Sequence, residues 1–124
     1  KNYHKNRSYI VVANHQSMAD IPVIHGYIGL KIKWIMKKEL EKIPVFGTAC
    51  RYLGCIYVDR SDHEAAMRSM ELAKKKLGKN SCVLFFAEGT RSRNGKIMPF
   101  KKGAFRFALE TGLPILPVTI KNSF

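Results

Sequence analysis

The strongest constraint on the fold is a run of six consecutive apolar residues, Cys82 to Ala87, set between two polar stretches. A strand of this kind has no polar face to turn toward water, so it suits the centre of a parallel sheet covered on both sides. A membrane-spanning helix needs about 20 apolar residues, and this run, the longest in the chain, is far shorter. It therefore predicts a central strand, and we expect no transmembrane segment or signal peptide in this sequence.

Strand and helix patterns alternate through the rest of the chain. Further strands are predicted over residues 9–13, 32–36, 55–59 and 115–120, and helices over residues 20–27, 44–53, 62–77 and 103–111. Gly78 is expected to end the third helix. Such alternation implies a largely parallel sheet with helices on its faces.

We therefore predict an α/β fold, a single layered domain with a largely parallel central sheet flanked by helices. One domain accounts for all 124 residues. The chain begins at Lys1 without an initiator methionine and enters a strand within ten residues. We expect residues 1–124 to be an excerpt of a longer chain.

The charge favours an anionic partner. The 22 lysines and arginines against 9 aspartates and glutamates give a net charge of +13. Phosphorylated metabolites, an anionic membrane and nucleic acid all fit this charge. Nucleic-acid readers usually add a helix-turn-helix, an aromatic stacking strand or a zinc pattern. None is evident, so we expect no nucleic-acid partner.

No metal site is predicted. Cys50, Cys55 and Cys82 contain no Cys-x-x-Cys pair and suit buried small apolar positions. His63-Glu64 begins like a zinc-protease helix, but Met67 stands where the second histidine is required.

His15 and Asp20 are the candidate catalytic pair. They lie five residues apart where an apolar strand meets a predicted helix, and the carboxyl ends of such strands are where open α/β sheets place their ligands. An imidazole can take a proton from an attacking hydroxyl when a carboxylate holds its other nitrogen. The alternative is a histidine that serves only packing or capping.

A second candidate site follows the apolar run. Glu88, Gly89 and Arg91 should emerge at the same kind of sheet edge as His15. Arginine suits bidentate contact with phosphate, and glycine lets the backbone approach a ligand closely. The alternative is a basic surface turn in which Glu88 pairs with a neighbouring arginine.

Arg60 repeats this arrangement after the strand that follows Gly54, and it is a candidate second phosphate ligand. The alternative is a surface ion pair with Asp59 or Asp62, which is a common and weak interaction.

Four blocks in this order make a specific pattern: residues 14–20, 54–60, 88–92 and 113–118. The sequence resembles the glycerolipid acyltransferases over almost its whole length. Within that family it is most similar to the 1-acyl-sn-glycerol-3-phosphate acyltransferases. Residues 34–47 and 98–105 are similar to that family too.

The resemblance implies transfer of a fatty acyl group from an acyl-CoA or acyl carrier protein thioester to the free hydroxyl of 1-acyl-sn-glycerol-3-phosphate, giving phosphatidic acid. It implies His15 as general base and Asp20 as its partner, with no cofactor beyond the thioester co-substrate. Other implied roles are phosphate binding by Arg60, Arg91, Lys37, Glu88, Gly89 and Thr90, and support of the acyl site by Pro114 and Pro117.

Two alternatives stay open. One is an acyltransferase of the same architecture that acts on glycerol-3-phosphate or another lysophospholipid. The other is a non-catalytic module that binds an anionic membrane or nucleic acid. The resemblance also implies a membrane surface as a partner, at the cytoplasmic face, and we expect a bacterial inner membrane.

Overall fold

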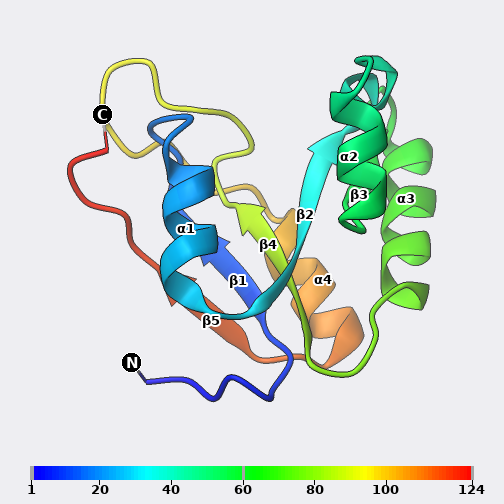
Figure 1. Cartoon of the computed structure of the whole chain (residues 1–124), viewed down its shortest axis with the longest axis horizontal. Coiled ribbons are helices and arrows are strands. Elements are labelled where there is room, and N and C mark those ends of the chain that lie inside the picture. Colours follow the sequence, from blue (N-terminus) through cyan, green and yellow to red (C-terminus); the bar gives the residue numbers. More distant parts are fainter. Residues whose placement is uncertain (1, 60, 124) are drawn as a thin grey trace. The chain divides into compact units, whose positions relative to one another are not determined.

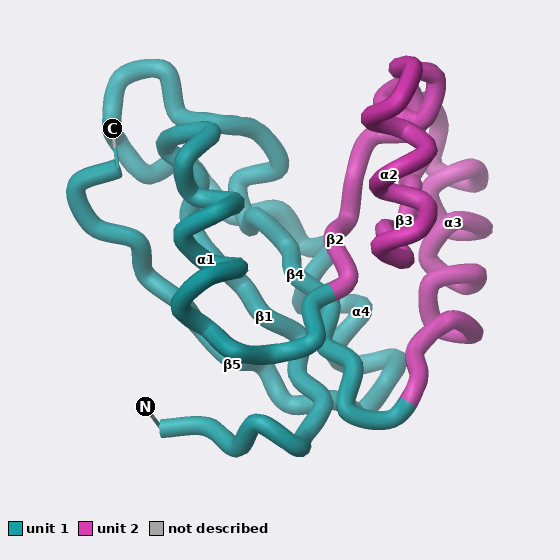
Figure 2. Tube along the Cα trace, viewed as in Figure 1, with its two compact units in different colours: residues 1–32, 79–124 teal, residues 33–78 magenta. Residues whose placement is uncertain are grey.

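The computed structural model describes residues 2–59 and 61–123 (Figure 1). The elements follow the order β1 (Ile10–Ala13), α1 (Asp20–Ile28), β2 (Lys31–Lys37), the 3-10 helix η1 (Lys38–Lys42), α2 (Phe46–Tyr52), β3 (Ile56–Val58), α3 (His63–Lys75), β4 (Ser81–Phe86), α4 (Gly103–Thr111) and β5 (Ile115–Val118). The chain divides into two compact units, residues 1–32 with 79–124 and residues 33–78 (Figure 2).

In the first unit, β1 lies between β4 and β5 and pairs with both in parallel. All four residues of β1 are buried, as expected for a strand with neighbours on both sides. Ala13 is opposite Phe86 of β4, so the residues that follow the two strands emerge at the same edge. This register brings two of the sequence blocks together.

Helix α1 turns one face inward, formed by Asp20, Ile24 and Ile28 at intervals of four residues. A carboxylate thus shares the buried face with two aliphatic side chains. Gly29 ends the helix in the left-handed conformation, which glycine adopts without a steric penalty.

Helix α4 packs on the face of the sheet that Phe85 of β4 lines. Its Phe107 ring lies 5.6 Å from the ring of Phe85, measured between centroids. Successive strand residues point to opposite faces, so Phe86 faces away from α4. This leaves the Phe86 face of the sheet for the site described below.

In the second unit, β2 and β3 pair in parallel, with Ile35 opposite Ile56. The sequence offers Ser61 or Asp62 as the cap of α3, and the structure shows Asp62, which accepts the Ala65 N–H at 2.7 Å. The expectation that Gly78 ends α3 is wrong. The helix ends at Lys75 because the Lys76 N–H bonds to the carbonyls of both Leu72 and Ala73, which tightens the last turn before Gly78 is reached.

Every strand pairing described within either unit is parallel, and helices pack on the strands. The predicted α/β class with a parallel sheet flanked by helices is confirmed. The 3-10 helix η1 was not predicted, since a five-residue segment with four charged residues shows no apolar periodicity. Across residues 2–59 and 61–123, helices of the length and apolarity needed to cross a bilayer do not occur.

Candidate active site

His15 and Asp20 form a buried pair in the first unit. The side-chain Nδ1 of His15 lies 2.9 Å from Oδ2 of Asp20. Asp20 is fully buried and His15 is nearly so. The sequence predicted this pair, and the structure brings the two side chains together.

The backbone that leads into α1 holds the Asp20 carboxylate in place. Its Oδ2 atom also accepts the N–H groups of Gln16 at 2.7 Å and Ser17 at 2.9 Å. Burial by itself would raise the pKa of Asp20, but the hydrogen bonds from the Ser17 backbone and the His15 side chain hold it below its ordinary value. Asp20 is therefore an anion at neutral pH.

An ionised carboxylate can only accept hydrogen bonds, so Nδ1 of His15 carries the proton of its hydrogen bond with Asp20. Neutral imidazole then has an unprotonated Nε2. The geometry supports His15 as a base at Nε2.

Glu88 braces the backbone on both sides of the site. Its Oε1 atom accepts the N–H of His15 at 2.8 Å, and its Oε2 atom accepts the N–H of Met98 at 2.9 Å. Only 2% of the residue is exposed. The alternative of an ion pair between Glu88 and a neighbouring arginine is wrong, because both carboxylate oxygens bond to backbone. The predicted part of Glu88 in phosphate binding remains a prediction.

Further hydrogen bonds tie the loop of residues 89–102 to the segment around His15. Ser92 donates its N–H to the His15 carbonyl at 2.8 Å, and Gln16 donates Nε2–H to the Gly95 carbonyl at 2.6 Å. On the other side of the segment, the Asn14 side chain both donates to and accepts from the backbone of Ile120, at 3.0 and 2.8 Å. The site is held by loops that are bonded to one another.

Phe86 stacks on His15, with ring centroids 3.7 Å apart and planes 11° from parallel. Nothing in the apolar run of residues 82–87 singles out this phenylalanine. The parallel register of β1 and β4 explains the contact, and a single sequence does not reveal that register.

Lys101 lies over Gly89. A Cβ atom added at Gly89 would come within 3.0 Å of Cδ and 3.1 Å of Nζ of this lysine. Gly89 has a positive φ of 74°, and the Lys101 N–H bonds to the Ala87 carbonyl at 2.8 Å. The missing side chain at Gly89 leaves room for the stem and the ammonium group of Lys101. In the sequence Lys101 is one of two adjacent lysines, and nothing there indicates this contact.

The other predicted residues fall in several places. Thr90 and Arg91 are exposed and follow Gly89 in the same loop. Pro114 precedes β5, where its carbonyl accepts the Ile10 N–H at 2.9 Å, and Pro117 lies in β5 opposite Val12. Lys37 is exposed at the end of β2 in the second unit, and Arg60 lies outside the described residues. The roles predicted for all of these residues remain predictions.

The aspartates near Arg60 in the sequence have other partners. Asp59 and Asp62, offered as partners for Arg60, pair with Lys38 and cap α3 respectively.

Fold and sequence agree on the class of protein. The family profile described as Acyltransferase matches residues 1–121. The chain belongs to the acyltransferase family, and the resemblance stated from the four blocks is confirmed.

Individual relatives are named more specifically. The chain is 40% identical over 115 residues to the 1-acyl-sn-glycerol-3-phosphate acyltransferase of Helicobacter pylori, covering 92% of this chain and 48% of that protein. It is 36% identical over 118 residues to the 1-acyl-sn-glycerol-3-phosphate acyltransferase alpha of Homo sapiens, covering 94% and 42%.

A crystal structure is also similar, that of the 1-acyl-sn-glycerophosphate (LPA) acyltransferase, PlsC, from Thermotoga maritima. The TM-score is 0.73 at 42% identity, covering 94% of this chain and 45% of that one. The chain thus spans less than half the length of each of these three proteins.

Proposed function

We propose that the protein transfers a fatty acyl group from a thioester to the free hydroxyl of 1-acyl-sn-glycerol-3-phosphate, giving phosphatidic acid. The observation that carries the proposal is the buried hydrogen bond between His15 and Asp20, at the carboxyl end of β1 in a chain of the acyltransferase family. The relatives named above, whose names state this acceptor, support it.

In the proposed reaction, Nε2 of His15 takes the proton of the acceptor hydroxyl while the hydroxyl oxygen attacks the thioester carbonyl. Asp20 stabilises the imidazolium that forms. The intermediate then expels the thiolate, which receives the proton from Nε2 and leaves as free thiol. The ester forms, the thioester breaks and no acyl-enzyme is needed. General-base catalysis of this kind contributes about 100- to 10,000-fold.

A covalent route through Ser17 is the less favoured chemistry. Ser17 accepts the Ala19 N–H at 3.2 Å on its hydroxyl oxygen, and its own N–H serves Asp20. It does not sit on the sharp Gly-x-Ser-x-Gly elbow that exposes a nucleophilic serine. A Ser17→Ala variant should retain most of its turnover.

We assign the acceptor phosphate to the loop that follows β4. Arg91 and Thr90 are exposed there, and Lys101 adds an ammonium group beside Gly89, whose missing side chain leaves room for it. Arginine provides bidentate hydrogen bonds and lysine a point charge, which suits a phosphate monoester.

The donor is acyl-CoA or acyl carrier protein thioester, and we propose a membrane surface as the place of reaction because both the acceptor and the product are lipids. Activity on glycerol-3-phosphate or another lysophospholipid is the second candidate, because a loop that recognises phosphate would serve these acceptors equally.

The test measures release of free thiol from acyl-CoA by the protein in detergent, with lysophosphatidic acid or glycerol-3-phosphate as acceptor. We expect release that depends on lysophosphatidic acid and that falls about 100- to 10,000-fold in His15→Ala. His25→Ala is the matched control, because His25 is exposed on α1, outside the site. Release that depends only on glycerol-3-phosphate would change the acceptor. Equal release by His15→Ala and the wild type would overturn the mechanism.

A further inference from the structure

We propose that an exposed apolar face of α2 docks the protein on an anionic lipid bilayer. The face, which we name the α2 surface, consists of Val45, Phe46, Ala49, Tyr52 and Leu53, all exposed to solvent. Val45, Tyr52 and Leu53 are 82%, 89% and 71% exposed. The proposal rests on the proposed function for its biological setting, since it names the surface through which a lipid-modifying protein meets its membrane.

Helical residues advance by about 100° each, so Phe46, Ala49, Tyr52 and Leu53 span roughly 120° of α2. Val45 directly precedes the helix, next to Phe46. The buried residues of α2, Gly47 and Cys50, lie outside this arc, beyond Phe46. An apolar stripe normally faces the core. Here it faces solvent.

The backbone before α2 presents this surface in a fixed conformation. The Phe46 N–H bonds to the Pro44 carbonyl at 2.6 Å, closing a γ-turn with Val45 at its centre. Val45 has φ 64° and ψ −54°, a strained conformation for a β-branched residue. A Cβ atom at Gly47 would lie 2.0 Å from the Glu41 carbonyl oxygen, so η1 and α2 are packed as closely as the chain allows. Strain of this kind tends to occur at functional sites.

The charges around the α2 surface favour an anionic partner. Residues 37–53 contain four cations and two carboxylates, namely Lys37, Lys38, Lys42, Arg51, Glu39 and Glu41. Glu41 pairs with Arg51 at 3.1 Å and Lys38 pairs with Asp59 at 3.3 Å.

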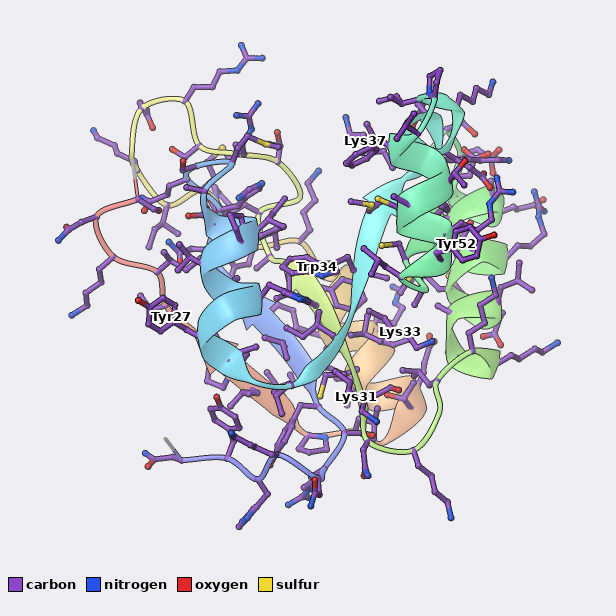
Figure 3. The ribbon with its side chains drawn as sticks, in the orientation of Figure 1. Tyr27, Lys31, Lys33, Trp34, Lys37 and Tyr52 are labelled. Carbon is purple, nitrogen blue, oxygen red and sulfur yellow. The ribbon has the colours of Figure 1, made fainter. Side chains whose placement is uncertain are left out.

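An anionic bilayer fits this combination better than a second copy of the chain does. Two copies with a net charge of +13 each would repel one another, whereas anionic lipids attract lysines near their headgroups. Tyr52 projects outward from α2 (Figure 3). Tyrosine is enriched at membrane interfaces, where its ring contacts lipid and its hydroxyl contacts water.

The test is flotation of the protein with vesicles of phosphatidylcholine alone or of phosphatidylcholine and phosphatidylglycerol in a 3:1 ratio. We expect Val45→Ser/Leu53→Ser to lower partitioning onto the anionic vesicles by about tenfold or more. The matched control is Val23→Ser/Leu109→Ser, which removes an exposed valine and an exposed leucine from α1 and α4. Circular dichroism and thermal unfolding establish that both variants fold, and Val45→Thr/Leu53→Asn offers a second route if the serine variant does not.

Partitioning that falls equally in both double variants, or in neither, would overturn the proposal. So would a loss of self-association in the α2 variant without loss of vesicle binding, since a second copy would then occupy the surface. Thiol release with acceptor in detergent micelles separates this result from the proposed function. The α2 variant should retain that activity, whereas an inactive wild type that still floats through the α2 surface would contradict the function alone.

Discussion

One oxygen of Asp20 receives the His15 side chain at 2.9 Å together with the backbone N–H groups of Gln16 and Ser17. The loop between the two residues thus wraps around the carboxylate that orients the histidine. The arrangement fixes the ring through the chain's own backbone, and it keeps the proton on Nδ1. Replacing Asp20 with asparagine keeps the shape of the side chain and removes its charge, so it tests the role of the charge.

We predict that Asp20→Asn lowers turnover about 100- to 10,000-fold, because an amide of the same shape no longer stabilises the imidazolium and favours the wrong tautomer of His15. The measurement is thiol release under saturating donor and acceptor. Asp62→Asn is the matched control, since asparagine caps a helix about as well as aspartate and Asp62 belongs to α3. Similar losses in the two variants would contradict the role of Asp20.

The pKa of Asp20 predicts acid sensitivity. A carboxyl group whose folded pKa is lowered stabilises the fold above its unfolded pKa of about 4, and this contribution is lost as the pH falls through the folded pKa. The free energy of unfolding, measured in urea at several pH values, should therefore fall below about pH 4.

Asp59 acts in the same direction, because hydrogen bonds from Ser61 and then Lys38 lower its pKa to about 2. In an Asp59→Asn background, the free energy of unfolding should still fall at acid pH because of Asp20. Adding Asp20→Asn should make this remaining fall smaller. An unchanged profile in Asp20→Asn would show that Asp20 has the same pKa in the folded and unfolded chains.

Much of the fold could be read from local pattern. The helix over residues 103–111 and the strand after Gly54 follow from apolar spacing and glycine breaks, and the structure has α4 at those residues and β3 within that segment. The end of α3 was missed because a bifurcated hydrogen bond at Lys76, rather than Gly78, closes the last turn. Short 3-10 segments such as η1 leave no periodicity to detect.

Only part of the site could be predicted, because a sequence shows local spacing but not the contacts between distant segments. His15 and Asp20 are five residues apart, so local spacing was enough to pair them. The contact of Phe86 depends on the register of two strands, and the contact of Lys101 depends on the path of a 14-residue loop. Local sequence patterns indicate neither. Glu88 was identified as a site residue, but its bonds to two distant backbone groups were not foreseen.

We predict that Glu88→Gln destabilises the protein by about 1–3 kcal/mol. Glutamine offers one acceptor oxygen where Glu88 uses two, so either the His15 or the Met98 N–H would face an amide donor in a buried place. The free energy of unfolding in urea measures the loss. Glu39→Gln, at an exposed position in η1, should change it little. Equal stability of Glu88→Gln and wild type would mean that the two bonds contribute nothing net.

Gly89 and Gly112 allow backbone strain to be separated from the contact with Lys101. Both have positive φ, 74° and 67°, so alanine at either position should cost about 1–2 kcal/mol. Only at Gly89 would the new methyl group meet a side chain, because the space around Gly112 is open to 4 Å. We expect Gly89→Ala to displace Lys101 and to raise the KM for lysophosphatidic acid several-fold.

Gly112→Ala should leave that KM unchanged despite a similar loss of stability. Lys101→Met, which keeps most of the stem and removes the charge, should reproduce the KM increase of Gly89→Ala with little loss of stability, because the Lys101 side chain is exposed. Initial rates at varied acceptor, with donor saturating, separate KM from kcat. A KM increase in Gly89→Ala that Lys101→Met does not share would show that the loop conformation, and not the charge of Lys101, matters for acceptor binding. Wild-type KM values in all three variants would remove both residues from acceptor binding.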